Sequence, residues 1–163
     1  MKNLFCLILV LITFSDTAFT QSRTIFVERT AASEASDTFI PYGPDEQEIL
    51  NLIDDQRIYW NNGDIENFMG GYWKSDSLMF IGKSGITYGW QKTLDNYKKG
   101  YPDTAAMGKL KFDILEIKRL SVMYFFVVGK WHLTRSIGDV GGHFTLLFKK
   151  IKNKWVIVAD HSS

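Results

Sequence analysis

Apolar side chains recur at helical spacing in the segment from Asp45 to Trp60. They stand three and four residues apart behind an acidic start, which predicts an amphipathic helix with favourable negative charge at its N-terminus. Asn61-Asn62-Gly63 follows, and a glycine after two asparagines is typical of a helix end. Asp64 has the chemistry of an N-terminal cap, so a second, short helix is predicted over residues 65–72.

The next part of the chain predicts a short strand, its hairpin partner and a third helix. Residues 78–81 form an uninterrupted apolar run closed by a glycine-containing tetrapeptide, as in a buried strand followed by a tight turn. Residues 86–88 can return as the hairpin partner. Beyond Gly89, aromatic and apolar residues from Trp90 to Gly100 have helical spacing, and Pro102 ends that helix.

The last third of the chain predicts strands alone. Apolar runs separated by short polar or glycine-containing turns are expected as strands at residues 108–120, 122–135, 142–152 and 154–162. Neighbouring strands with short connections form an antiparallel meander. A long sheet with an apolar face must cover that face, and the early helices are the available partner. We therefore predict an α+β domain, in which a strongly bent sheet of four long strands and a short hairpin folds over about three helices as an open-mouthed cone.

The N-terminal residues have the proportions of a secretion signal. Lys2 precedes an apolar run from Leu4 to Phe14, and a polar segment follows. Because the run is about half of the ~20 residues that a membrane-spanning helix needs, we expect residues 1–20 to be a signal peptide and the protein to be exported to the periplasm or secreted. An uncleaved anchor is the alternative. Residues 21–44 resemble a linker or arm, and residues 45–163 are expected to form one domain.

Composition narrows the classes of function. Cys6 is the only cysteine and lies within the leader, so the processed chain is expected to have neither a disulfide nor a thiol nucleophile. The formal net charge is +1 with scattered charges, which gives no electrostatic case for nucleic acid or for a membrane after signal cleavage. Three histidines without paired spacing predict no metal site, and without a glycine-rich nucleotide motif we expect no cofactor.

An ordered set of short motifs covers nearly all of residues 45–163. It consists of Trp60-Asn61-Asn62-Gly63-Asp64, Tyr72-Trp73-Lys74-Ser75-Asp76-Ser77-Leu78, Gly89-Trp90, Tyr101-Pro102, Gly129-Lys130-Trp131, Gly141-Gly142-His143-Phe144-Thr145-Leu146 and residues 155–163. The set resembles the SnoaL-like, nuclear transport factor 2-like superfamily, and more narrowly a branch described as a domain of unknown function. The resemblance implies a cystatin-like roll. Its functional implication is broad, because related cones include isomerases, cyclases, dehydratases and modules that bind or dimerise.

Ketosteroid-isomerase-like chemistry is one possibility that this resemblance raises. It needs a carboxylate base, a tyrosine and a protonated aspartate. Counted from the Asn-x-Gly-Asp turn, the base position falls near Phe80 or Ile81, the tyrosine position on Gln56 and the aspartate position near Leu146. None of these side chains can perform those roles, so steroid-type isomerisation is not expected.

Cyclase and dehydratase relatives use a histidine and an aspartate inside the cone. The candidate catalytic residues here are His161, Asp160 and His132. Asp160 and His161 are adjacent on a predicted strand, so only one of them can face the cone, and the titration range of histidine favours His161. In the same way, either Trp131 or His132 faces inward. The alternative for each candidate is a structural hydrogen bond.

Aromatic residues make up 15% of the sequence, and the surplus over packing needs can line a pocket for a flat or apolar ligand. Plain core packing with a dimer face is the alternative. The candidate pocket-lining residues are Tyr59, Tyr72, Trp90, Tyr97, Trp131 and Phe144.

Two functions are consistent with these patterns. The first is an exported cone that binds a small apolar or aromatic molecule, with acid–base chemistry of the isomerase, cyclase or dehydratase kind as a possible activity. The second is a non-catalytic module that forms a homodimer through the outer face of its sheet, because residues 122–128 offer apolar side chains to both faces. A cavity open to solvent favours the first function, and a filled interior favours the second.

Overall fold

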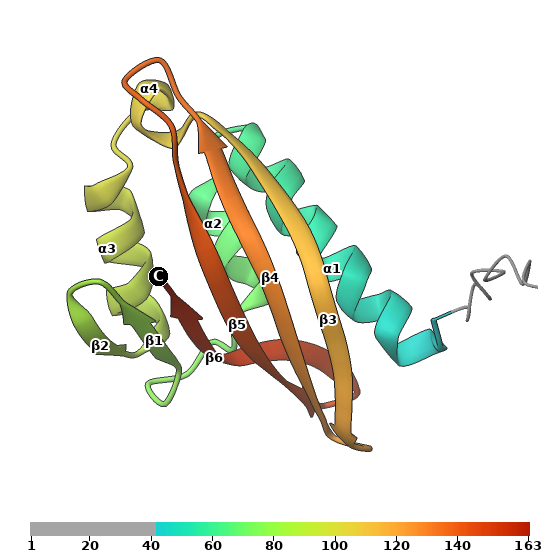
Figure 1. Ribbon diagram of the computed structural model, residues 1–163. Coiled ribbons are helices and arrows are strands. Elements are labelled where there is room, and N and C mark those ends of the chain that lie inside the picture. Colours follow the sequence, from blue (N-terminus) through green and yellow to red (C-terminus); the bar gives the residue numbers. More distant parts are fainter. Residues whose placement is uncertain (1–41) are drawn as a thin grey trace, which may run out of the picture. The chain divides into compact units, whose positions relative to one another are not determined.

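The computed structural model describes residues 42–163 (Figure 1). The predicted signal peptide and nearly all of the predicted arm lie outside the described residues. Within the described part of the chain, no helix combines the length and the apolar character needed to cross a membrane.

The first two predicted helices are present, and the residues predicted to end the first helix and to cap the second lie between them. Helix α1 (Pro44–Asn61) is followed by Gly63, whose positive φ of 78° explains why glycine occupies this position. Helix α2 (Ile65–Phe68) and the 3-10 turn η1 (Met69–Gly71) cover most of the second predicted helix. The Asp64 Oδ1 atom accepts a hydrogen bond from the Asn67 N–H at 3.0 Å, as expected of an N-cap.

The third predicted helix is α3 (Trp90–Gly100), with the bounds that the sequence indicates. A fourth helix, α4 (Thr104–Met107), was not predicted. The Asp103 side chain caps it by accepting from the Ala106 N–H at 2.8 Å. Four residues are too few to show a helical period, so only the cap could have indicated this turn.

The sheet contains the predicted antiparallel meander and joins the hairpin to it. Its spatial order is β2-β1-β6-β5-β4-β3. The parallel pairing of β1 with β6 was not predicted, and it places Phe80 beside Asp160. In Figure 1, α1 runs along the long strands and β6 bends toward the β1–β2 hairpin. The strands are β1 (Met79–Gly82), β2 (Gly85–Tyr88), β3 (Lys109–Ser121), β4 (Tyr124–Thr134), β5 (Val140–Ile151) and β6 (Lys154–Ser162).

Gly141 and Gly142 correct one detail of the sequence interpretation. The strand was predicted to begin at residue 142, but β5 begins at Val140, so both glycines lie within it. A Cβ atom on Gly142 would come within 1.7 Å of the Ser163 carbonyl oxygen, and one on Gly141 within 2.8 Å of the Trp131 carbonyl oxygen. The two glycines therefore allow close approach of neighbouring backbones.

Alternation along the strands separates an inner face from an outer one. On β4, Phe125 and Val127 are fully buried, whereas Phe126 and Val128 between and beyond them are partly exposed. The inner face packs against α1 and α2, where Ile49 is fully buried. This arrangement is the amphipathic sheet-over-helix packing that the hydrophobic pattern predicts.

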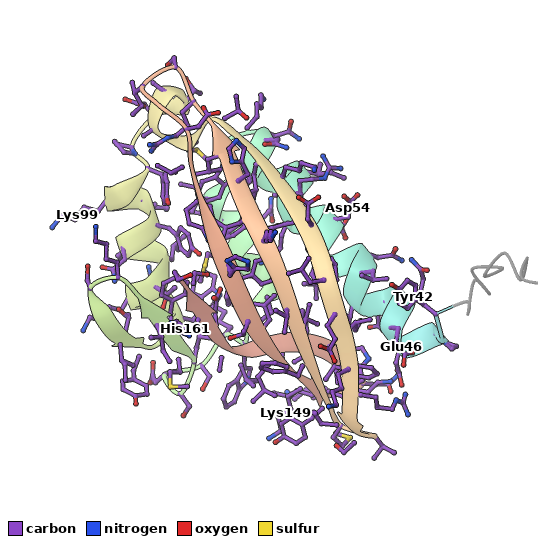
Figure 2. The ribbon with its side chains drawn as sticks, in the orientation of Figure 1. Tyr42, Glu46, Asp54, Lys99, Lys149 and His161 are labelled. Atoms are coloured by element: carbon purple, nitrogen blue, oxygen red, sulfur yellow. The ribbon has the colours of Figure 1, made fainter. Side chains whose placement is uncertain are left out.

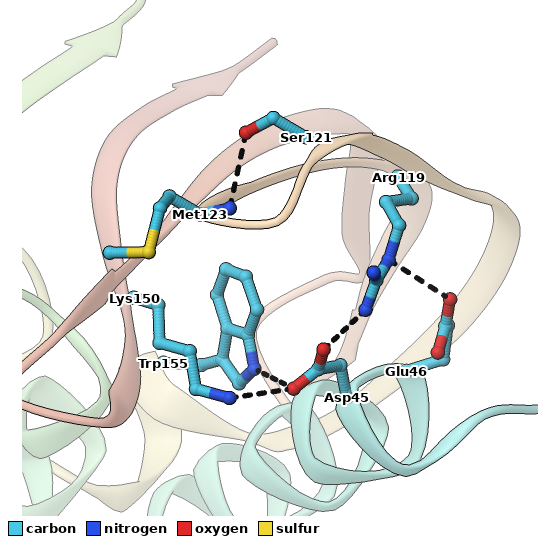
Figure 3. Close-up of polar contacts among 7 residues, drawn as sticks. All are labelled: Asp45, Glu46, Arg119, Ser121, Met123, Lys150 and Trp155. Carbon is cyan, nitrogen blue, oxygen red and sulfur yellow. Dashed lines mark hydrogen bonds and ion pairs between the residues drawn. The ribbon is translucent and has the colours of Figure 1, made fainter.

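The N-terminal end of α1 is attached to the sheet by a polar cluster (Figure 3). The Asp45 Oδ1 atom accepts hydrogen bonds from Lys150 Nζ at 2.8 Å and from Trp155 Nε1 at 3.1 Å. Its Oδ2 atom pairs with Arg119, which also lies 3.9 Å from Glu46 Oε1. One carboxylate thus connects α1 to β3, β5 and β6.

Candidate functional site

A cavity of about 870 Å³ lies between the inner face of the sheet and the helices. Its wall is mostly apolar and aromatic, with Phe112 and Leu133 among the contributing residues. The rim carries Lys83 and Lys99, and Figure 2 shows the Lys99 side chain extending from α3 toward solvent. A smaller surface hollow of about 450 Å³ lies outside this cavity, near the ion pair between Lys98 and Glu66. The larger space has the size and lining of a small-molecule site.

Asp160 is the one acidic side chain among the residues that line this cavity. Its side chain is buried, with 4% of its surface exposed. The Tyr72 hydroxyl donates a hydrogen bond to Asp160 Oδ2 at 2.7 Å, and the Ser162 hydroxyl donates to Oδ1 at 2.9 Å. Both carboxylate oxygens therefore have a donor, which makes burial of this group tolerable.

An irregularity in the sheet explains why Asp160 faces the cavity. Trp155 and Ile157 are buried, and strict alternation from them would place His161 on the inner face. The pairing of β5 with β6 shifts register between Leu147 and Phe148, and Val158 is left without a partner there. The extra residue reverses the alternation, so Asp160 is buried and His161 is exposed.

The surroundings of Asp160 change its acidity. Burial raises the pKa of the Asp160 carboxyl to about 6, although the hydrogen bonds from Tyr72 and Ser162 act in the opposite direction. Burial also raises the pKa of the Tyr72 and Tyr97 hydroxyls well above the ordinary value, and the negative charge of Asp160 adds to both shifts. The tyrosines therefore keep their protons, while Asp160 exchanges its proton near neutral pH.

Four of the six predicted pocket residues line the cavity. They are Tyr72, Tyr97, Trp131 and Phe144. Tyr59 is 37% exposed on α1 and lies outside the lining. Trp90 also lies outside it, because its indole Nε1 donates to the Met69 carbonyl oxygen at 2.9 Å in the packing between α3 and η1.

The histidines are placed away from the cavity, which corrects the preference for His161 over Asp160. His161 and His143 are exposed. His132 is half exposed, and its Nε2 atom lies 3.3 Å from Asp139 Oδ2. Its neighbour Trp131 faces inward instead. No histidine is therefore among the residues that line the cavity.

The positions counted for isomerase chemistry do belong to the cavity wall. Gln56, Phe80 and Leu146 all line it. The Gln56 amide donates to the Phe68 carbonyl oxygen at 3.1 Å, a structural hydrogen bond. Counting from the Asn-x-Gly-Asp turn therefore identified positions on the cavity wall. It did not identify the Tyr72–Asp160 pair, whose two residues lie 88 positions apart in the sequence.

Metal binding has no support in the described residues. Among residues 42–163, no group of three or more His, Cys, Asp or Glu side chains is arranged to hold a metal ion.

Solved structures show which proteins this chain is similar to. An NTF-2-like protein of unknown function from Shewanella oneidensis MR-1 is 46% identical, with a TM-score of 0.70, over 72% of this chain and 98% of that chain. The chain belongs to the nuclear transport factor 2-like (NTF2-like) family. No protein-family model and no curated protein matches it.

More distant solved structures share the fold alone. A cystatin-like domain of unknown function from Nostoc punctiforme is 13% identical, with a TM-score of 0.63, over 76% of this chain and 78% of that one. A ketosteroid isomerase-like protein from Erwinia carotovora atroseptica is 15% identical, with a TM-score of 0.59, over 75% and 97%. These likenesses support the cystatin-like roll that the sequence motifs imply.

Proposed function

We propose that this NTF2-like domain binds a small, mostly apolar molecule in its cavity and holds it by the Tyr72–Asp160 pair. One observation carries the proposal: a buried, hydrogen-bonded carboxylate stands in the wall of an otherwise largely apolar cavity. Burying a carboxylate costs folding free energy. A buried carboxylate that packing does not require is therefore a candidate functional group.

The wall offers a ligand several polar contacts. Asp160 can accept a hydrogen bond when ionised and donate one when protonated, and its pKa of about 6 makes both forms accessible near neutral pH. The lining also includes the Thr87 hydroxyl and the Asn96 amide. The ligand that fits has an apolar body and one polar group, such as a hydroxyl, an N–H or a carbonyl.

Proton transfer is the chemistry that this arrangement can perform. A carboxyl with a pKa near the working pH can take a proton from a bound molecule and return it at another atom. The Tyr72 hydroxyl donates to Asp160 and holds the carboxyl in place. We propose acid–base chemistry by Asp160 on this basis, in place of His161 or His132.

The test uses the neutral fluorescent probe N-phenyl-1-naphthylamine. We expect saturable binding with a rise in probe fluorescence. Thr87 lines the cavity, so Thr87→Trp should fill part of it and weaken probe binding at least about tenfold. Thr134 is exposed outside the cavity, so the matched control Thr134→Trp should leave probe binding unchanged. Absence of saturable binding, or equal loss in both variants, contradicts the proposal.

A second candidate function is self-association through the outer face of the sheet. Phe126 and Val128 of β4 and Leu147 of β5 are partly exposed on this face, and Phe126 pairs directly with Leu147. Apolar side chains at the centre of a sheet face can form a symmetric contact between two copies. This candidate is compatible with an occupied cavity, because the two use opposite faces.

A further inference from the structure

The turn between β3 and β4 has an unusual composition. Turns at the surface favour glycine, proline, asparagine and aspartate, whereas this two-residue turn is Val122-Met123, and Leu120 and Ser121 precede it at the end of β3. Leu120 is 54% exposed, Val122 71% and Met123 43%. The Ser121 hydroxyl accepts a hydrogen bond from the Met123 N–H at 3.1 Å, so the turn is locally ordered (Figure 3). Three neighbouring apolar side chains are thus held in solvent.

The turn between β5 and β6 lies at the same end of the domain. The Lys150 N–H donates to the Met123 carbonyl oxygen at 2.9 Å, which joins the β3–β4 turn to the end of β5. Lys152 and Lys154 are exposed beside this contact. Lys149, labelled at the lower end of Figure 2, has its Nζ atom 5.5 Å from the centre of the Tyr124 ring. Three lysines of the β5–β6 hairpin therefore lie on one side of the apolar turn.

The acidic residues nearest to this end are already engaged. Asp45 pairs with Lys150 and Arg119, and Glu46 lies within 3.9 Å of Arg119. Among residues 42–163, no carboxylate forms an ion pair with Lys149, Lys152 or Lys154; the known pairs use other cations. The surface formed by residues 120–123 with these three lysines is apolar at its tip and positive on one side of it.

We propose that this surface, the basic tip, binds the interface of a bilayer that contains anionic phospholipid. The apolar side chains of residues 120, 122 and 123 insert among the lipid headgroups, and the lysines contact the phosphates. Three side chains offer too little apolar area for a stable protein interface. The neighbouring positive charge favours negatively charged lipid over a neutral membrane.

Helix α1 begins at this end of the domain, since Asp45 contacts Lys150 and Trp155 there. That cluster engages Lys150 and leaves the other three lysines of this end without an ion pair among residues 42–163. The sequence alone gave no case for a membrane, because the apolar residues 120–123 come to lie beside the lysines of residues 149–154 only when β4 pairs with β5.

Vesicle sedimentation tests the proposal on the protein as cells process it, with its N-terminus determined by mass spectrometry. We expect binding to vesicles of phosphatidylcholine with phosphatidylglycerol, and at least about tenfold weaker binding to phosphatidylcholine alone. Lys152→Glu with Lys154→Glu should reduce binding by a similar factor. The matched charge control is Lys92→Glu with Lys130→Glu, at exposed positions of α3 and β4 outside the cavity lining.

The apolar turn has its own matched control. Ile137 lies in the turn between β4 and β5 and is 63% exposed. Leu120→Ser with Val122→Ser should reduce binding to the anionic vesicles at least about fivefold, whereas Ile137→Ser should not change it. Undetectable vesicle binding, or binding equal in the tip variants and their controls, overturns the proposal. A change in molar mass with the tip variants would instead identify a second copy as the partner.

Discussion

Val158 determines which side chain of the last strand enters the cavity. The unpaired residue reverses the alternation that Trp155 and Ile157 begin, and so it places Asp160 inside and His161 outside. Alternation along a strand correctly predicted that only one of Asp160 and His161 faces the cone. It could not select the residue, because a bulge depends on the partner strand and leaves no local pattern.

The raised pKa of Asp160 predicts a pH-dependent stability. The folded-state pKa of about 6 lies above the ordinary value of 3.8, so the folded chain binds more protons and loses stability as pH rises from about 4 to about 6. A shift of this size corresponds to about 3 kcal/mol in the free energy of unfolding. Asp160→Asn removes the titration, so its stability relative to the original protein should rise over this range.

Urea unfolding at a series of pH values measures this difference. Asp76→Asn, a change at an exposed aspartate, is the matched control and should show no such trend. If the difference between the Asp160→Asn variant and the original protein were constant from pH 4 to pH 7, the carboxyl would not have the raised pKa.

At the scale of elements, the N-terminus of α1 depends on a single carboxylate. Asp45 receives hydrogen bonds from Lys150 and Trp155 and pairs with Arg119. The hydrogen bond from Lys150 is the main cause that lowers the Asp45 pKa. Its negative charge at a helix start also complements the helix dipole.

Asp45→Asn should reduce the free energy of unfolding by about 1–2 kcal/mol at pH 7, since charge-assisted hydrogen bonds lose their charged acceptor. Glu48→Gln, at an exposed position of the same helix, should change it by less than about 0.5 kcal/mol. Chemical denaturation with both variants compares the two losses. If the Asp45→Asn and Glu48→Gln variants were equally stable, the polar contacts of Asp45 would not contribute to stability as proposed.

The longer elements were well predicted and the contacts between distant ones were not. Helix α3 and strand β6 have the predicted bounds, because each has a sustained hydrophobic period and a clear terminating residue. The parallel pairing of β1 with β6 joins residues about 80 positions apart. Periodicity carries no information on such pairing, and the environment of Asp160 depends on it.

At the scale of the whole molecule, the outer sheet face predicts an association that can be tested. Phe126 lies at its centre beside Leu147, so Phe126→Lys would place a charge in the proposed symmetric contact. We expect the original chain to sediment as a dimer at micromolar concentration and the variant as a monomer.

Ile86→Lys is the control, because Ile86 is 57% exposed on β2, away from this face. Analytical ultracentrifugation gives the molar mass of each protein. A monomer in all three samples would exclude this contact, and loss of the dimer in both variants would exclude Phe126 as its centre.

The position of β6 also has a consequence for synthesis of the protein on the ribosome. This strand is the last element along the described chain, yet it lies in the middle of the sheet, between β1 and β5. Until it leaves the exit tunnel, the β1–β2 hairpin has no strand through which to join the meander, and Tyr72 has no Asp160 to contact. Because non-local strand pairing is also slow to form, the nascent domain stays incomplete until its final residues emerge, and the cavity acquires its carboxylate last.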